Sequence, residues 1–252
     1  MLAEEFWNKN KDYNPIGKKV LLYSGGSDSW LISHLYEPDI KLYINIHGRY
    51  SEEEMKRLPD DVIIEDLDLH RWERADAIVP LRNLYFVMLA TNYGDDICLR
   101  ATAGDRVRDK SLEFKKLTNE LLNYLYGPQH WVPEGRKINV NIDYKGYTKK
   151  QMLKLYLDQG GDIELAVKGS FSCYNPIDGK ECFACKPCFR KAVASMINGY
   201  KYSENEEKTL YNYMKKEIIP DILEGTYGRG EEEEADILTI YSELDKKYHK
   251  GE

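Results

Sequence analysis

Five short runs rich in valine, isoleucine, leucine and tyrosine mark the first part of the chain. They occupy residues 18–23, 40–46, 62–66, 95–101 and 138–142. Between them, residues 83–94 and 111–127 place apolar side chains at helical spacing, and a glycine lies at the end of each segment. Strands that alternate with helices predict right-handed crossovers and a parallel sheet with helices on both faces. The pattern therefore predicts an α/β fold.

The alternation fades after about residue 150. The remainder predicts helix, a cysteine-rich turn at 173–188 and further helix, without an internal repeat. We expect two domains, an α/β domain over 1–150 and a helical region over 151–252. The acidic run at 231–234 is typical of the solvated start of an amphipathic helix, because acidic side chains favour a first helical turn.

Composition and charge narrow the class of protein. The chain has 252 residues, is 42% hydrophobic and carries a net charge of −7. No stretch reaches the roughly 18 uninterrupted apolar residues of a membrane span, and the N-terminus lacks the pattern of a signal peptide. We therefore expect no membrane association and a cytoplasmic location. The acidic balance argues against stable nucleic-acid binding, which needs clustered lysine and arginine, and favours a small-molecule substrate.

The first apolar run ends in a loop rich in glycine and serine. The loop residues are Ser24, Gly25, Gly26, Ser27, Asp28 and Ser29. Adjacent glycines permit backbone N–H groups to converge on an anion, and the following helix start adds a favourable dipole for phosphate. The spacing is neither that of the P-loop nor that of the dinucleotide-binding glycine motif. An ordinary strand-to-helix turn with a serine or aspartate cap is the alternative.

The hexapeptide SGGSDS resembles the PP-loop signature SGGxDS of the ATP pyrophosphatases. The resemblance implies that a substrate oxygen is adenylated with release of pyrophosphate. It implies that Ser24, Gly25, Gly26, Ser27 and Ser29 hold the pyrophosphate, and that Asp28 helps to bind Mg²⁺. Ser27 and Asp28 are then the candidate catalytic residues.

Four of the five cysteines lie close together as Cys173, Cys182, Cys185 and Cys188. Four thiolates at this spacing suit tetrahedral Zn²⁺ in a closed structural site. An iron–sulfur cluster and metal-free reduced cysteines are the alternatives. The fifth cysteine, Cys98, is expected in the core.

Three basic residues, Lys186, Arg190 and Lys191, lie at the end of the cysteine cluster and just after it. We expect their charges to be solvated at the surface, with phosphate contact as the alternative.

The loop and the cysteine block together resemble the QueC family of 7-cyano-7-deazaguanine synthases. The shared features are SGGSDS, RNLYF at 82–86, SCY and CFACKPCFRKA, in the same order from about residue 18 to 195. The resemblance implies an adenine nucleotide alpha hydrolase-like (Rossmann-like) fold and a homodimer. It also implies ATP-dependent conversion of 7-carboxy-7-deazaguanine and ammonia to the nitrile, a C–N ligase reaction that uses ATP, Mg²⁺ and Zn²⁺.

Further site residues follow from position at the carboxyl edge of the predicted sheet. Ile44 and Ile46 are expected to contact adenine, with strand core as the alternative. Arg82 and Asn83 are expected to meet the nucleotide or the adenylate, with surface solvation as the alternative. The loop at 100–114 is expected to bind the deazapurine base through Gly104, Asp105, Arg106 and Asp109.

The loop at 100–114 departs from the Tyr-Pro-Asp-type segment of the QueC family. The chain therefore also fits a related PP-loop ligase that stops at the amide, or one that adenylates another acid or a tRNA base. A zinc-knuckle protein that binds nucleic acid is a third reading, which the acidic balance disfavours.

Overall fold

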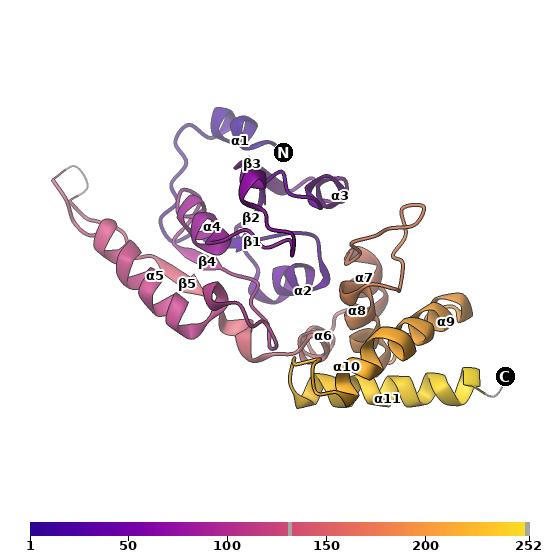
Figure 1. Ribbon diagram of the computed structural model, residues 1–252. Coiled ribbons are helices and arrows are strands. Elements are labelled where there is room, and N and C mark those ends of the chain that lie inside the picture. Colours follow the sequence, from indigo (N-terminus) through magenta and orange to yellow (C-terminus); the bar gives the residue numbers. More distant parts are fainter. Residues whose placement is uncertain (131–132, 250–252) are drawn as a thin grey trace. The chain divides into compact units, whose positions relative to one another are not determined.

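A computed structural model of the chain describes residues 1–130 and 133–249 (Figure 1). By their internal packing, these residues form two compact units. The first unit consists of Met1–Gly25, Ile32–Ala101 and Asp105–Lys145. The second unit consists of Gly26–Leu31, Thr102–Gly104 and Gly146–Glu252. The expected domains over 1–150 and 151–252 stay a prediction, because compact packing does not establish independent folding.

The first unit contains a parallel sheet of five strands in the order β3-β2-β1-β4-β5. The strands are β1 (Lys19–Leu22), β2 (Ile40–Asn45), β3 (Val62–Asp66), β4 (Asp96–Cys98) and β5 (Asn139–Asn141). Each of the five predicted runs contains one strand, so the α/β class is confirmed. Val20 of the central strand lies beside Ile40 on one side and Ile97 on the other. The carboxyl ends of β1, β2 and β4 therefore share one edge of the sheet.

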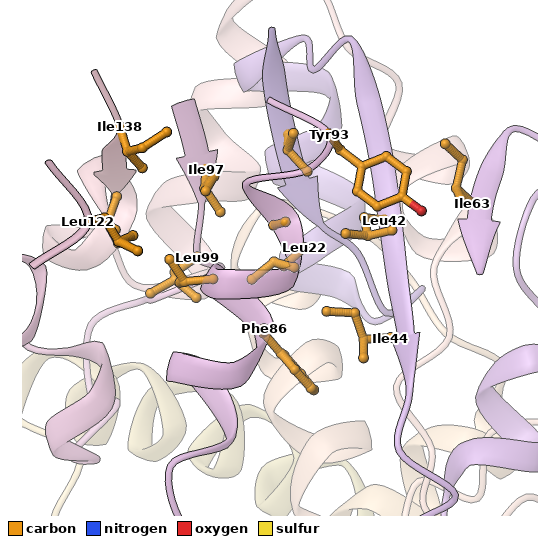
Figure 2. Close-up of a cluster of buried hydrophobic side chains, with 14 of the residues drawn as sticks. Leu22, Leu42, Ile44, Ile63, Phe86, Tyr93, Ile97, Leu99, Leu122 and Ile138 are labelled. Carbon is orange, nitrogen blue, oxygen red and sulfur yellow. The ribbon is translucent and has the colours of Figure 1, made fainter. Parts of the chain in front are cut away.

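Helices and apolar side chains pack around this sheet. The helices are α1 (Ala3–Lys9), α2 (Ser27–Tyr36), α3 (Ser51–Met55), α4 (Arg82–Ala90) and α5 (Leu112–Leu125), with short turns η1 (His70–Trp72), η2 (Arg108–Lys110) and η3 (Asp143–Gly146). Figure 2 shows Leu22, Leu42 and Ile97 from neighbouring strands in one apolar cluster with Phe86 of α4 and Leu122 of α5. The helices predicted at 83–94 and 111–127 are confirmed as α4 and α5.

The second unit is mainly helical; it includes the first residues of α2, the short segment Thr102–Gly104 and the cysteine-rich turn. Its other helices are α6 (Lys149–Asp158), α7 (Ile163–Gly169), α8 (Lys186–Ile197), α9 (Glu204–Tyr213), the π-helical η4 (Met214–Ile218), α10 (Ile219–Leu223) and α11 (Glu231–Tyr248). Phe189, Leu210 and Ile240 join α8, α9 and α11 in a core of their own. Across the described ranges, 1–130 and 133–249, no helix combines the length and the hydropathy needed to span a membrane.

Gly94 marks a close approach of the chain to the edge of β1. A Cβ atom at this position would lie 2.5 Å from the Lys18 carbonyl oxygen and 2.6 Å from a methyl group of Val20. We predict that Gly94→Ala lowers the free energy of unfolding by about 1–3 kcal/mol, because backbone and a buried side chain must move. Urea unfolding measures the change. Gly146→Ala is the control, since its Cβ would meet no atom within 4 Å, and equal midpoints for the two variants would contradict the prediction.

Candidate active site

The glycine-serine loop begins in the first unit, at the carboxyl end of β1. Gly25 has a φ of +74°, which a residue with a side chain rarely adopts, so glycine makes the turn possible. The Ser24 hydroxyl accepts a hydrogen bond from Nη1 of Arg100, which follows β4. Sequence reasoning missed Arg100. Its signal is the position directly after an apolar strand whose carboxyl end neighbours that of β1.

The loop continues in the second unit, where Gly26 starts α2 by accepting from Trp30 N at 2.9 Å. The Ser29 hydroxyl donates to the same Gly26 carbonyl at 3.0 Å. The Ser27 backbone N–H donates to Oγ of Ser172, also at 3.0 Å. The loop is therefore tied at several atoms, and the start of a ten-residue helix gives it the partial positive charge that favours a phosphate.

Lys149 brings a full positive charge to this part of the loop. Its ammonium group contacts the Asp28 carboxylate and donates to Ser27 Oγ at 3.1 Å. The side chain is 12% exposed. Thr148 and Gln151 form a capping box that fixes Lys149 as the first residue of α6. Sequence reasoning missed Lys149 as well, although the spacing Thr148-x-x-Gln151 is a recognisable helix start.

A pocket opens within the first unit, at the carboxyl ends of β1 and β2. Ile44, Ile46 and Arg82 line it, together with Arg100. Ile44 is only 5% exposed and packs in the sheet core, as its alternative reading expected; its contact with adenine stays a prediction. Arg82 is half-buried, and its guanidinium lies 5.9 Å from the centre of the Phe86 ring.

Polar groups give the pocket a defined rim. Arg49 and Glu73 form an ion pair of 2.7 Å across two loops of the pocket wall. Burial, with a smaller contribution from Asp61, raises the pKa of Tyr23 to about 12, so its phenol is neutral at physiological pH. A flat apolar ligand with polar edges suits such walls.

The four residues expected to bind the base have different surroundings in the structure. Asp109 accepts a hydrogen bond from the Asn83 backbone N–H at 3.4 Å, so the structure brings these two predicted residues together at the start of α4. Asn83 itself is buried. The Asp105 carboxylate forms an ion pair of 3.0 Å with Lys110, and Arg106 is exposed. Gly104 belongs to the second unit.

The four clustered cysteines meet in the second unit. The sulfur atoms of Cys173, Cys182, Cys185 and Cys188 lie within 4.8 Å of one another, and all four residues are buried. The backbone N–H groups of Cys182 and Ala184 donate to cysteine sulfurs at 3.4 Å. Such donors stabilise thiolates. The thiol of Cys188, despite the opposing effect of burial, lowers the pKa of Cys185 to about 5.

The donor set fits zinc. A tetrahedral ion with Zn–S distances of about 2.3 Å needs sulfur atoms about 3.8 Å apart, which a small contraction of the cluster provides. Four sulfur ligands would leave no open position, so the ion would connect chain segments and would not meet a substrate.

Hydrogen bonds connect the cysteine element to the glycine-serine loop. Ser172, which precedes the first clustered cysteine, accepts from Ser27 N through its hydroxyl and donates its own N–H to Glu181 at 2.6 Å. Glu181 also accepts from Lys191 at 2.9 Å. Lys191 is 4% exposed, so the expectation of solvated charge is wrong for this residue. Its ammonium group is satisfied inside the unit by Glu181 and by the Ser170 carbonyl.

Arg190 and Glu233 form a second buried ion pair. Two guanidinium nitrogens donate to the two carboxylate oxygens at 2.6 and 2.8 Å. Burial disfavours both charged groups. The hydrogen bonds and the charge of Arg190 nevertheless hold the pKa of Glu233 below its usual range. The acidic run begins α11, and Glu231 and Glu232 are exposed, as expected of a solvated helix start. The expectation of solvated charge is wrong for Arg190, and within the acidic run for Glu233, because tertiary packing places α11 against α8.

Comparison with known proteins finds one matching family model and several relatives named as 7-cyano-7-deazaguanine synthases. The family model of queuosine biosynthesis protein QueC matches residues 54–198, more than half of the chain. A 7-cyano-7-deazaguanine synthase 2 of Sulfurisphaera tokodaii is 27% identical over 226 residues, which cover 73% of this chain and 46% of that protein. A 7-cyano-7-deazaguanine synthase of Sulfolobus acidocaldarius is 28% identical over 139 residues, which cover 52% of this chain and 26% of that protein.

A third relative, the 7-cyano-7-deazaguanine synthase of Methanobrevibacter smithii, is 27% identical over 156 residues, 59% of this chain and 61% of that protein. The matches to these three relatives thus span 26–61% of their length. The family match includes Lys149 and the four cysteines; it begins after the glycine-serine loop and ends before α9.

Proposed function

Because this chain belongs to the QueC family, we propose that it converts 7-carboxy-7-deazaguanine and ammonia to 7-cyano-7-deazaguanine with consumption of ATP. The observation that carries the proposal is the phosphate loop with Lys149 at Ser27 and Asp28. A carboxylate is a poor electrophile. Adenylation by ATP gives the carboxylate AMP as a leaving group, and a loop that binds the departing pyrophosphate supports this step.

The proposed chemistry has two activation steps. A carboxylate oxygen attacks the α-phosphorus of ATP, the bond to pyrophosphate breaks, and ammonia then displaces AMP to give the amide. The amide oxygen attacks a second ATP in the same way, and loss of AMP and two protons gives the nitrile. Each carboxylate oxygen leaves on one AMP. Catalysis is mainly positioning and charge stabilisation around the phosphates.

The roles proposed for the loop follow its contacts. Ser24, Gly25, Gly26, Ser27 and Ser29 hold the pyrophosphate. Lys149 stabilises the charge that develops on the departing pyrophosphate, because its ammonium group already lies at the Ser27 hydroxyl. Ile44 and Ile46 contact adenine, and Arg82 and Asn83 meet the nucleotide.

Two metal ions belong to the proposal. Mg²⁺ neutralises phosphate charge when it is bound, and the Asp28 carboxylate is the group that holds it, since this ion binds through one or two carboxylates together with substrate phosphates. Zn²⁺ is held by the four clustered cysteines and has a structural role. Ser172 connects that element to the loop through Ser27, so the metal site supports the loop's geometry.

The base and the quaternary structure are further parts of the proposal. Gly104, Asp105, Arg106 and Asp109 bind the deazapurine base, and Asp109 is supported by its bond to Asn83. A homodimer is proposed as well. Leu117, Leu121 and Tyr124 form an exposed apolar row along α5, as a helix that pairs with another chain does. Sedimentation equilibrium tests this, and a monomer at all concentrations would contradict it.

Pyrophosphate release tests the proposed function. The assay contains ATP, Mg²⁺ and ¹⁵N-ammonia, with and without the deazaguanine acid, and the product is identified by mass. We expect release only with the acid, at two pyrophosphates for each labelled nitrile. One pyrophosphate and a labelled amide would identify the ligase that stops at the amide. No acid-dependent release would contradict the proposal, and binding of labelled RNA in moderate salt would favour the zinc-knuckle reading.

A further inference from the structure

Arg229 lies in the second unit, and its guanidinium has one buried nitrogen atom. The residue lies outside the family match, which ends at residue 198. Its Nη1 atom is buried and has no hydrogen-bond partner among the residues that the structure describes. An unsatisfied donor of a buried charged group is costly, and buried charges are normally paired. The atom therefore lacks a hydrogen-bond acceptor among the described residues.

The neighbouring cations already have carboxylate partners. Arg190 occupies both oxygens of Glu233, and the Tyr227 hydroxyl donates to one of them at 2.7 Å. The positive charge of Arg229 contributes to the lowered pKa of Glu233, so the two side chains lie near each other. No carboxylate in 1–130 or 133–249 forms an ion pair with Arg229, whereas Lys149 is paired with Asp28. Arg229 thus has no hydrogen-bonded carboxylate of its own, although its charge lies near that of Glu233.

Arg229 lies beside Gly104, one of the residues expected to bind the substrate. Gly104 has a φ of +82°, and a Cβ atom there would lie 3.1 Å from the Arg229 carbonyl oxygen and 3.6 Å from its Nη1. The unpartnered nitrogen therefore lies directly at the Gly104 turn. The positive φ favours glycine at this position, and a Cβ atom would lie closer to the Arg229 carbonyl oxygen than most Cβ atoms lie to a neighbour.

We propose that Arg229 binds the carboxylate of the substrate acid. The inference rests on the proposed function. A guanidinium matches a carboxylate in shape and charge, and a contact to one oxygen leaves the other free to attack ATP. The amide of the second activation step has no negative charge. Arg229 therefore acts as a specificity residue for the acid, and its contribution falls on the first step.

The test compares Arg229→Gln with the wild type in pyrophosphate release, with the acid, the amide and ATP varied in turn. We expect the KM for the acid to rise about 10- to 100-fold, as the loss of a hydrogen bond to a charged group implies. The KM values for the amide and for ATP should stay within about twofold, since neither depends on the carboxylate. Arg229→Lys, which keeps the charge, should give an intermediate KM for the acid.

Lys216→Gln is the matched control, because it removes one charge from the same unit at a side chain that is 82% exposed. An unchanged KM for the acid in folded Arg229→Gln would overturn the inference and leave the proposed function intact. A rise in the KM for ATP alone would overturn it too, and would assign the anion to a phosphate. If Arg229→Gln does not fold, a wild-type KM in Arg229→Lys, together with acid binding unchanged in calorimetry, would overturn it. No acid-dependent release by the wild type would overturn both proposals.

Discussion

Replacement of Lys149 by alanine should reduce pyrophosphate release at least about 100-fold, the usual loss when one preorganised group that stabilises transition-state charge is removed. The ammonium group lies 3.1 Å from Ser27 Oγ and contacts Asp28. The side chain of Lys149 is 12% exposed, so the charge acts in a largely buried setting. Steady-state turnover at saturating ATP and acid is the measurement, with the thermal midpoint recorded for each variant.

Lys154→Ala is the control for this prediction. Lys154 lies on the same helix, and its exposed side chain pairs with Asp158 one turn away. An exposed pair of this kind contributes little to stability, so this variant should keep wild-type turnover. Asp28→Ala should also lose turnover, and the double variant should lose little more than either single variant, because the two residues act as a unit. Turnover of Lys149→Ala within about threefold of the wild type would contradict the assignment.

The second large effect is expected at the cysteine cluster. Cys185→Ser should abolish binding of one zinc ion for each chain and leave most of the protein insoluble on expression. The cluster lies at the N-terminus of α8, and folding of such an element draws on the free energy of metal binding. Metal content by mass spectrometry and the soluble fraction are the measurements. Iron in place of zinc in the wild type would identify the iron–sulfur alternative.

Cys98→Ala is the matched variant for the cluster. Cys98 is buried in β4, and burial, followed by the charge of Asp96, raises the pKa of its thiol. The variant should therefore keep its full metal content. Chelation of the wild-type protein should lower its thermal midpoint and slow pyrophosphate release together, because Ser172 transmits the geometry of the cysteine element to Ser27. A soluble Cys185→Ser protein with full turnover would contradict the structural role.

The sequence by itself determined the sheet. Apolar runs bounded by polar segments predict strands whatever their partners are, since a strand buried on both faces must be apolar along its length. The five strands lie at the predicted places. The cysteine spacing was equally informative, because a cluster within sixteen residues needs only a local turn to bring its sulfurs together.

Only the tertiary structure decided which charges are buried. Lys149, Lys191, Arg190 and Glu233 each have a sequence context that also suits an exposed helix surface. Their pairing joins residues far apart in the chain, such as Lys149 with Asp28 and Arg190 with Glu233. Helical periodicity gives the face on which a residue lies but not the element that covers this face. The glycine-serine loop was therefore recognisable from the sequence, whereas the contact of Lys149 with Ser27 and Asp28 required the fold.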